Sequence, residues 1–300
     1  MRPAESTQPH PTADPETNAN RCPLPDTSLL QSLSDQDFRS YCTDGLWGFR
    51  HSSTQQPLLP CIYDNVDEFC EGLACICRNG LWGYIDHTGR EVVPCRYAHT
   101  FSFRDGRGRV IRDDCNGYVN AQGQEIIPCN YADADSFCEE RARVSPDFFN
   151  HGFIDPDGNE VIPCIYEEVE NFCNGMSAVS SEGLWGFTDR FGKVVIPLDY
   201  TQVHSFNEGL AAVSNGGRWG FINTRNEVII PFQYDEAIGF SEGLAPVCLN
   251  GRWGFINSQG DTVIPMQYDA AYLFHHYSAV VVLGDEQFCI DSTGHRIELE

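Results

Sequence analysis

Apolar residues along the chain fall in short stretches separated by small groups of polar residues and glycine. Between positions 210 and 231 three such stretches follow one another, at 210–214, 218–223 and 227–231. Short apolar stretches bounded by Asn, Asp and Gly are typical of strands joined by tight hairpin turns. Each unit of this kind therefore predicts a three-stranded antiparallel sheet.

The apolar positions also indicate which faces of these strands are covered. Trp219 and Phe221 project to one side of their strand and Ile222 to the other, while 228–230 is apolar without alternation. Strands of this kind are covered on both faces, so we expect sheets to stack on sheets. Gly220 interrupts its strand, where glycine costs conformational entropy, and its presence predicts the close approach of another backbone or ring.

The same unit recurs along the chain with a nearly fixed period. Its most regular feature is a Trp-Gly-aromatic triplet, and successive copies in the C-terminal part lie 34 residues apart. A period between about 20 and 50 residues indicates a repeat architecture. The triplet tryptophans are Trp47, Trp82, Trp185, Trp219 and Trp253, and other residues replace the tryptophan at Asn116, His151 and Glu286.

Turn and linker residues complete the unit. The second and third strands are joined by Asp or Asn followed three residues later by Gly, which is hairpin chemistry. The third strand is predicted to end at its proline, which lacks the N–H needed to continue a ladder. A linker of about a dozen residues would then cross back to the next sheet. Tyr234 and Phe240 occupy fixed linker positions and are predicted to hold this crossing in place.

We assign the five tryptophans, together with Tyr234 and Phe240, to the structural core of the repeats. A buried indole removes roughly 150 to 250 Å² from water and contributes strongly to a core. The repeats centred on Asn116 and His151 lack this side chain. They are therefore expected to pack less tightly and to exchange their amide hydrogens faster than the regular repeats.

Three regions differ in composition. Residues 1–26 contain six prolines and almost no apolar side chains, which predicts a disordered tail. Residues 27–37 begin after an N-cap candidate and carry leucines at helical spacing, so we expect a short helix that caps the array. The repeats occupy residues 38–300.

The recurring segments LWGYIDHTGREVVPCRY, GRWGFINTRNEVIIPFQY and GRWGFINSQGDTVIPMQY resemble the bacterial WG-repeat family, which is also described by its Lys-Trp-Gly variant. The resemblance covers about residues 38–300, or eight copies. It implies an all-β repeat module that serves as a binding or interaction scaffold. It implies no catalytic residues. In this chain Leu or Arg stands where that variant has its lysine.

Two architectures fit such a repeat: an open curved stack resembling a β-solenoid, or a closed ring resembling a propeller. A ring is commonly closed by one sheet built from both chain ends. Here the first copy, 38–63, and the last, 278–300, each contain all three predicted strands. Atypical terminal repeats are also a feature of capped open arrays. We therefore predict the open array and keep the closed ring as the alternative.

The charge of the chain restricts its partners. Its formal net charge is −24, from 43 acidic and 19 basic residues. Nucleic acids and anionic membranes bind clustered Lys and Arg, so we expect neither. A protein partner with a basic patch fits this charge better. Candidate contacts for that partner are Glu71, Glu208, Asp235 and Glu242.

Fourteen cysteines bear on location and metal binding. The N-terminal segment offers no apolar signal sequence, which favours a reduced, cytoplasmic protein. Several cysteines recur at one repeat position where other copies have Leu, Phe or Met, as expected for small buried apolar side chains. A metal ladder, a disulfide stack, or a site at Cys75 and Cys77 is the alternative. We expect no metal and no cofactor.

Catalytic patterns do not emerge from the sequence. It contains no glycine-rich phosphate loop, no nucleophile elbow and no zinc-protease motif. We therefore expect a non-catalytic repeat scaffold that mediates protein–protein interaction through an acidic extended surface. The alternative is a carbohydrate-binding or carbohydrate-processing module that uses exposed aromatic side chains and paired carboxylates.

Overall fold

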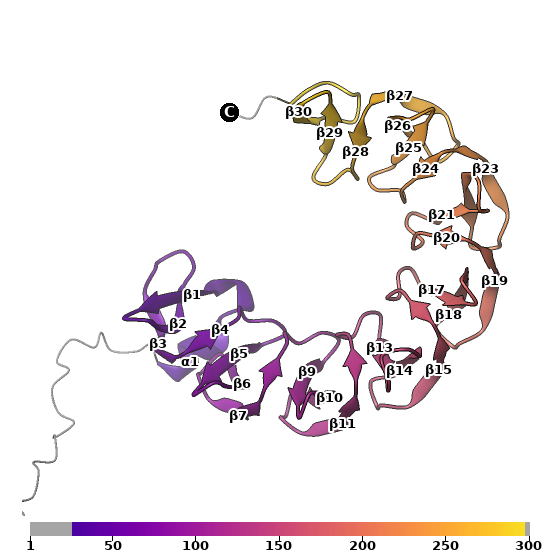
Figure 1. The fold of residues 1–300 in the computed structure, drawn as a ribbon. Helices are drawn as coiled ribbons and strands as arrows, with labels where there is room; N and C mark the ends of the chain where they lie inside the picture. The colour runs from indigo at the N-terminus through magenta and orange to yellow at the C-terminus, as the bar shows by residue number, and fades with distance from the viewer. Residues whose placement is uncertain (1–25, 298–300) are drawn as a thin grey trace, which may run out of the picture.

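The computed structural model describes residues 26–297, which form an all-β array of eight small antiparallel sheets (Figure 1). Six of these sheets have four strands, and the first and last have three. They follow one another along an open arc whose two ends lie apart (Figure 1). The predicted open array is therefore confirmed, and residues 26–297 do not form a closed ring. The tail predicted over 1–26 lies, apart from Asp26, outside the described residues.

Each four-stranded sheet is a meander in which consecutive strands pair. The first sheet lacks the first of these four strands, and the last sheet lacks the fourth. The two-residue first strands are β4 (Asn65–Val66), β8 (His99–Thr100), β12 (Asp133–Ala134), β16 (Glu168–Val169), β20 (Gln202–Val203), β24 (Glu236–Ala237) and β28 (Ala270–Ala271). The second strands are β1 (Phe38–Thr43), β5 (Leu73–Arg78), β9 (Arg107–Arg112), β13 (Ala142–Ser145), β17 (Met176–Ser181), β21 (Leu210–Ser214), β25 (Ala245–Leu249) and β29 (Ala279–Leu283).

A hairpin leads from each second strand to the third, and a turn leads to the fourth. The third strands are β2 (Leu46–His51), β6 (Leu81–Asp86), β10 (Cys115–Asn120), β14 (His151–Ile154), β18 (Leu184–Asp189), β22 (Trp219–Asn223), β26 (Arg252–Ile256) and β30 (Glu286–Ile290). The fourth strands, which lie along the convex rim in Figure 1, are β3 (Pro57–Tyr63), β7 (Glu91–Tyr97), β11 (Glu125–Tyr131), β15 (Glu160–Tyr166), β19 (Val194–Tyr200), β23 (Val228–Tyr234) and β27 (Thr262–Tyr268).

The strand that was predicted to end at proline continues through it, so that prediction is wrong. Strand β23 runs past Pro231 to Tyr234. Phe221 pairs with Ile230 and Trp219 pairs with Tyr234, so three residues of β23 bulge opposite Gly220 alone. A bulge leaves its residues out of the ladder, and the missing N–H of Pro231 therefore costs no ladder hydrogen bond.

The same bulge explains the mid-strand glycine. A β-carbon at Gly220 would lie 2.7 Å from the carbonyl oxygen of Ile230 and 3.0 Å from the amide nitrogen of Phe232. The predicted close approach of a backbone at Gly220 is confirmed. A larger residue there would force the bulge open.

The crossover between sheets is also shorter than predicted. After Tyr234 only Asp235 separates β23 from β24, which is the first strand of the next sheet. Each long outer strand thus passes directly into its neighbouring sheet, and part of the predicted linker is a fourth strand. The predicted aromatic contacts are present nevertheless, since Phe240 packs on Phe221 with ring centroids 5.0 Å apart.

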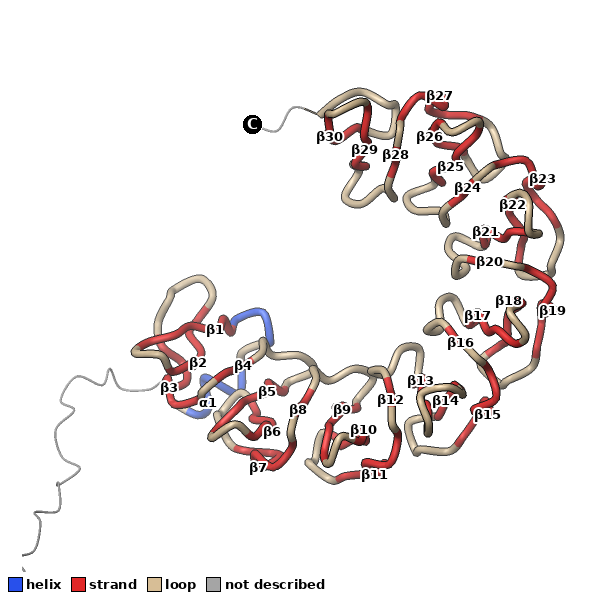
Figure 2. Tube along the Cα trace, in the orientation of Figure 1, coloured by secondary structure: helices blue, strands red, loops and turns tan. Residues whose placement is uncertain are grey.

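A short helix precedes the first sheet. Helix α1 spans Thr27–Ser32, and the side chain of Asp26 accepts a hydrogen bond from the N–H of Ser28. The helix buries Leu30 in the cluster that contains Phe38 and Phe49. A 3₁₀ turn, η1, spans Asp35–Asp37. Figure 2 shows that helix is confined to this end of the trace. Within 26–297 no helix has the length and apolar character needed to cross a bilayer.

Candidate binding groove

The five tryptophans lie at the margins of the cores between neighbouring sheets. Each indole packs against a buried cluster but is itself only half-buried. By contrast, Phe221, Tyr234 and Phe240 are 0%, 3% and 1% exposed. The centre of the core is therefore formed by the phenylalanine of the triplet and the linker aromatics. The tryptophans assigned to that core leave part of each indole accessible.

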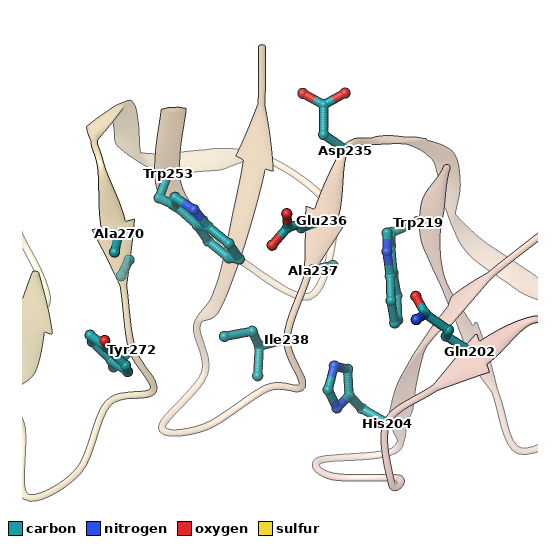
Figure 3. Close-up of a pocket in the computed structure, with 11 residues that line it drawn as sticks. Gln202, His204, Trp219, Asp235, Glu236, Ala237, Ile238, Trp253, Ala270 and Tyr272 are labelled. Atoms are coloured by element: carbon teal, nitrogen blue, oxygen red, sulfur yellow. The ribbon is translucent and has the colours of Figure 1, made fainter. Parts of the chain in front are cut away.

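Over the C-terminal repeats these indoles line a groove (Figure 3). It extends from Trp219 on β22 to Trp253 on β26 and encloses about 670 Å³. Strand β24 crosses between the two indoles, and Figure 3 shows Glu236 lying between them. The other lining residues are Gln202, His204, Asp235, Ala237, Ile238, Ala270, Ala271 and Tyr272.

A second cavity continues this groove toward the middle of the array. It encloses about 360 Å³ and shares His204 and Trp219 with the first. Its other end is formed by Trp185 and Glu168. We call the combined surface, which carries the indoles of Trp185, Trp219 and Trp253, the tryptophan groove.

The register of the first strands places the lining residues. Glu236 and Ile238 stand two and four residues after Tyr234, and both line the groove. In extended chain such residues share one side. Ala237 also lines the groove but belongs to the core on its other side. These residues are absent from the contacts predicted from the sequence, because their segment is predicted there to be a crossing linker. The sequence does mark these two positions, because the residue type at each varies between copies. Other copies have Gln202 and His204, or Ala270 and Tyr272, at the same two positions.

Two carboxylates of the groove differ in their surroundings. Asp235 forms an ion pair with Arg218 and accepts a hydrogen bond from the N–H of Gly251 at 3.3 Å. Glu236 is exposed, and within the described part of the chain its carboxylate accepts no hydrogen bond. Asp235 is therefore engaged within the protein, and Glu236 is the carboxylate that the larger cavity presents, while the exposed Glu168 lines the second cavity.

His204 forms part of the groove wall. Its ring stacks on the indole of Trp219 with centroids 5.3 Å apart and an interplanar angle of 24°. Burial lowers the pKa of His204, and the neighbouring Glu170 opposes this shift only in part. The imidazole is therefore neutral near pH 7, so it does not oppose a cation in the groove.

Three of the four carboxylates predicted as partner contacts lie elsewhere. They stand in the turns that precede the second strands, and each accepts a backbone hydrogen bond from the equivalent turn of the next repeat. The pairs are Glu71 with Gly106 at 2.8 Å, Glu208 with Gly243 at 3.0 Å and Glu242 with Tyr277 at 2.9 Å. Their geometry gives them a structural role, and only Asp235 of the predicted set lines the groove.

Arginine takes the place of tryptophan in the third copy. The guanidinium of Arg109 donates to the side-chain oxygen of Asn116 at 3.1 Å and also to the carbonyl oxygen of Ala134. Its central carbon lies 3.5 Å above the centre of the Phe101 ring. Asn116 is only 5% exposed. The looser packing expected at Asn116 is thus absent, because an arginine from the adjacent strand fills the space.

The fourth copy uses a related arrangement. Arg143 lies 3.2 Å from Nδ1 of His151 through Nη1. It also forms ion pairs with Asp133 at 2.9 Å and Asp135 at 2.7 Å. The copies of Asn116 and His151 therefore each carry a hydrogen-bonded arginine at the tryptophan site, although the Nε of Arg109 is buried without a partner among the described residues.

Metal and thiol chemistry finds little support among residues 26–297. No group of three or more His, Cys, Asp or Glu side chains in this range converges as a metal site would require. The thirteen described cysteines carry free thiols. Burial raises the pKa of the Cys75 thiol to about 12 and that of Cys164 to about 11. These thiols are therefore protonated and weakly reactive near pH 7.

Comparison with known proteins identifies a matching sequence family and a solved structure with a similar fold. The sequence model of a family described as WG containing repeat matches residues 47–82, 82–114, 117–145, 152–185, 185–219, 219–253 and 253–278. No curated protein sequence matches the chain. The solved structure of a eukaryotic initiation factor is similar over 96% of this chain and 89% of its own, with a TM-score of 0.52 and 8% identity.

A second similar structure is that of BamB from Moraxella catarrhalis. It matches 87% of this chain and 93% of its own length, with a TM-score of 0.39 and 12% identity. At such low identity these likenesses concern the fold alone.

Proposed function

The chain belongs to the WG containing repeat family, and from this premise we propose that it is a non-catalytic repeat scaffold that binds a protein partner. Repeat arrays present extended surfaces to which successive units contribute equivalent positions. In this chain the tryptophan groove is such a surface. Neighbouring repeats supply one half-buried indole each, together with residues from the first strands.

The tryptophan groove is the observation that carries the proposal. Partly exposed Trp and Tyr side chains are enriched at the energetic centres of protein interfaces, because they offer a large apolar area with little conformational freedom. Here Trp219, Trp253 and Tyr272 line one groove of about 670 Å³. Glu236 and, in the second cavity, Glu168 are exposed carboxylates, so the groove is suited to polar and cationic contacts beside the indoles.

The acidic surface indicates the kind of partner. A net charge of −24 attracts proteins with a basic patch and repels acidic ones. Association driven in this way weakens as salt screens the charges. We therefore propose a partner that carries a basic patch, and we propose that the protein acts in the cytoplasm.

Affinity capture from a native lysate of the source cell tests this function. The immobilised chain should retain basic proteins at low salt and lose them as salt rises. The Trp253→Leu variant should retain less of these proteins. The Trp82→Leu variant should retain as much as the unmodified chain, because Trp82 does not line the tryptophan groove. Retention of acidic proteins alone, or retention that salt does not change, contradicts the proposal.

Carbohydrate binding is the second candidate. It is favoured by the row of indoles at Trp185, Trp219 and Trp253, because aromatic faces are suitable platforms for apolar faces of sugars. A glycan array distinguishes the two functions. Binding to one class of sugar that Trp219→Leu abolishes would favour this candidate over a protein scaffold.

A further inference from the structure

We propose that the tryptophan groove binds arginine side chains carried on an extended segment of the partner. This inference rests on the proposed protein-binding function and specifies its chemistry. It is drawn from the copies of Asn116 and His151, two of the three that lack tryptophan, in which the chain places its own arginines at the equivalent site.

Strand register shows which positions are equivalent. Across their hairpins, Arg109 pairs with Tyr118 and Arg143 pairs with Phe153. In the tryptophan-containing copies the phenylalanine of the triplet pairs instead with a small or cyclic residue. These residues are Ala178, Ala212 and Pro246. Arginine therefore occurs at this position in the copies of Asn116 and His151, whereas Val281 occurs in the terminal copy of Glu286. A side chain too short to reach the site occurs beside Trp185, Trp219 and Trp253.

The contacts of Arg109 correspond one by one to the groove. Asn116 occupies the repeat position of Trp219, Ala134 that of Ala237, and Phe101 that of His204. The three groove residues Trp219, Ala237 and His204 all line the cavity. The surroundings that hold the Arg109 guanidinium thus recur in the groove, where no arginine of residues 26–297 lines the equivalent place.

The contacts of Arg143 also correspond to residues of the groove. It binds Asp133, Asp135 and His151, which occupy the repeat positions of Gln202, His204 and Trp219. These groove residues also line the cavity. Two independent arginines of the chain therefore map onto one set of groove positions.

The groove offers suitable partners to an arginine from another protein. An indole face attracts a guanidinium more strongly than other aromatic faces do, and two such indoles flank Glu236. The planar guanidinium can stack on a ring and donate to a carboxylate at the same time. Lysine offers no such plane, so we expect arginine to be preferred.

Peptide binding provides the first test. The probes are a labelled peptide of alternating glycine and arginine, the same peptide with citrulline in place of arginine, and the same peptide with glutamate. Citrulline keeps the shape of the side chain and removes its charge. We expect the arginine peptide to bind and the other two to bind at least about tenfold more weakly. Equal binding of the arginine and citrulline peptides would overturn the proposal.

Indole N–H resonances locate the binding. The chain has five tryptophans, so its indole signals can be assigned from single substitutions. Addition of the arginine peptide should shift the signals of Trp219 and Trp253 and leave that of Trp82 unchanged. A shift of Trp82 alone, or of no indole while the peptide binds, places binding outside the groove and contradicts the proposal.

Matched variants separate a specific contact from general attraction. Glu236→Gln and Asp285→Asn each remove one negative charge from an exposed residue. Only Glu236→Gln should weaken binding of the arginine peptide, by about tenfold. Equal weakening by both variants indicates non-specific attraction to the acidic surface and overturns the proposal.

A graft tests the equivalence of the sites directly. The double variant Ala212→Arg with Trp219→Asn reproduces the Arg109 and Asn116 pair of the third copy. The chain's own arginine should then occupy the groove, so the variant should remain folded by thermal unfolding and bind the peptide at least tenfold more weakly. Trp219→Leu serves as the second variant if the graft does not fold. Undiminished peptide binding by whichever of the two folds would refute the inference.

The outcomes also distinguish this inference from the proposed function. If native lysate still yields a basic partner that depends on Trp253, but arginine peptides do not bind, the scaffold function stands and the arginine chemistry is wrong. If arginine peptides bind at the groove and no partner depends on it, the groove chemistry stands and the scaffold function fails.

Discussion

The carboxylate of Glu208 accepts a hydrogen bond from the backbone N–H of Gly243, 35 residues further along the chain, at 3.0 Å. The same bond, also spanning 35 residues, joins Glu71 to Gly106 and Glu242 to Tyr277, which stands where the other two turns have glycine. These bonds connect consecutive repeats outside their apolar cores. They fix the spacing of neighbouring turns as the arc curves, and they explain why an acidic residue stands at this position in several copies.

This hydrogen bond predicts that Glu208 contributes to the stability of the fold and not to partner binding. Glu208→Ala should lower the free energy of unfolding by about 1 kcal/mol, because an exposed charge-assisted hydrogen bond between repeats is lost. Urea unfolding measures this change. Glu236→Ala is the matched control, since its carboxylate is exposed and should leave stability unchanged. A larger loss for Glu236→Ala than for Glu208→Ala would contradict the assignment of the two roles.

The partial exposure of the tryptophans predicts that their removal costs less stability than removal of the fully buried phenylalanines. Phe221 is 0% exposed, so Phe221→Ala should cost about 3 to 5 kcal/mol. Trp219 lies at the margin of that core with part of its indole exposed, so Trp219→Ala opens a less enclosed space and should cost only about 2 to 3 kcal/mol. Equilibrium unfolding of both variants measures the difference. If Trp219→Ala is the more damaging, the tryptophans form the centre of the core after all.

The contacts of Arg109 predict that amide hydrogens exchange equally slowly in regular and irregular repeats. Because its guanidinium bonds Asn116 and Ala134, strand β10 should exchange its amide hydrogens about as slowly as strand β22. Arg109→Met keeps the apolar stem but leaves the buried acceptors unpaired, which should cost about 1 to 3 kcal/mol and speed exchange in β10. Rapid exchange of β10 in the unmodified protein would show that Arg109 does not replace the tryptophan.

The repeat unit illustrates what sequence can reveal here and what it cannot. Gly220 signals a close backbone approach by its type alone, because glycine is unfavourable in mid-strand without such a reason. Pro231 misleads, because the rule that proline ends a ladder has an exception at bulges, and a bulge depends on register between strands. Local sequence does not contain that register.

The groove was missed for a related reason. Trp219 was correctly placed in the repeat, but its partial exposure depends on how far the next sheet stands away, which is a property of packing. Glu236 and Ile238 could have been found from their variability within an otherwise regular unit. The replacement of tryptophan by Arg109 was hidden because the arginine lies on a different strand from Asn116.

Glu125 predicts a pH dependence of stability. Hydrogen bonds from Arg112, at 2.8 Å to each carboxylate oxygen, lower the pKa of Glu125, and they outweigh the opposing effect of burial. A lowered folded pKa means that this group stabilises the protein above its unfolded pKa of about 4.3 and that the contribution is lost as pH falls through the folded pKa.

The measurement is urea unfolding between about pH 7 and pH 3. The unmodified chain should lose stability on acidification, and Glu125→Gln should lose less over the same interval, because it has already lost the ion pair with Arg112. Glu236→Gln, which removes an equal charge without an arginine partner, should follow the unmodified chain. Parallel pH profiles for the unmodified chain and Glu125→Gln would rule out this origin of acid sensitivity.

The cysteines supply a final prediction that bears on location. Thirteen described thiols are free, and the buried Cys75 has its pKa raised to about 12. In the native protein an alkylating reagent near pH 8 should therefore modify the exposed Cys42 well before Cys75, because attack requires access and a thiolate. After denaturation without reductant nearly all fourteen thiols should titrate if the protein is cytoplasmic, as proposed. A large deficit of titratable thiol in protein isolated from its native cell would mean oxidation in an oxidising compartment. That outcome would reject the proposed location but leave the packing of Cys75 intact, since the order of alkylation tests the packing separately.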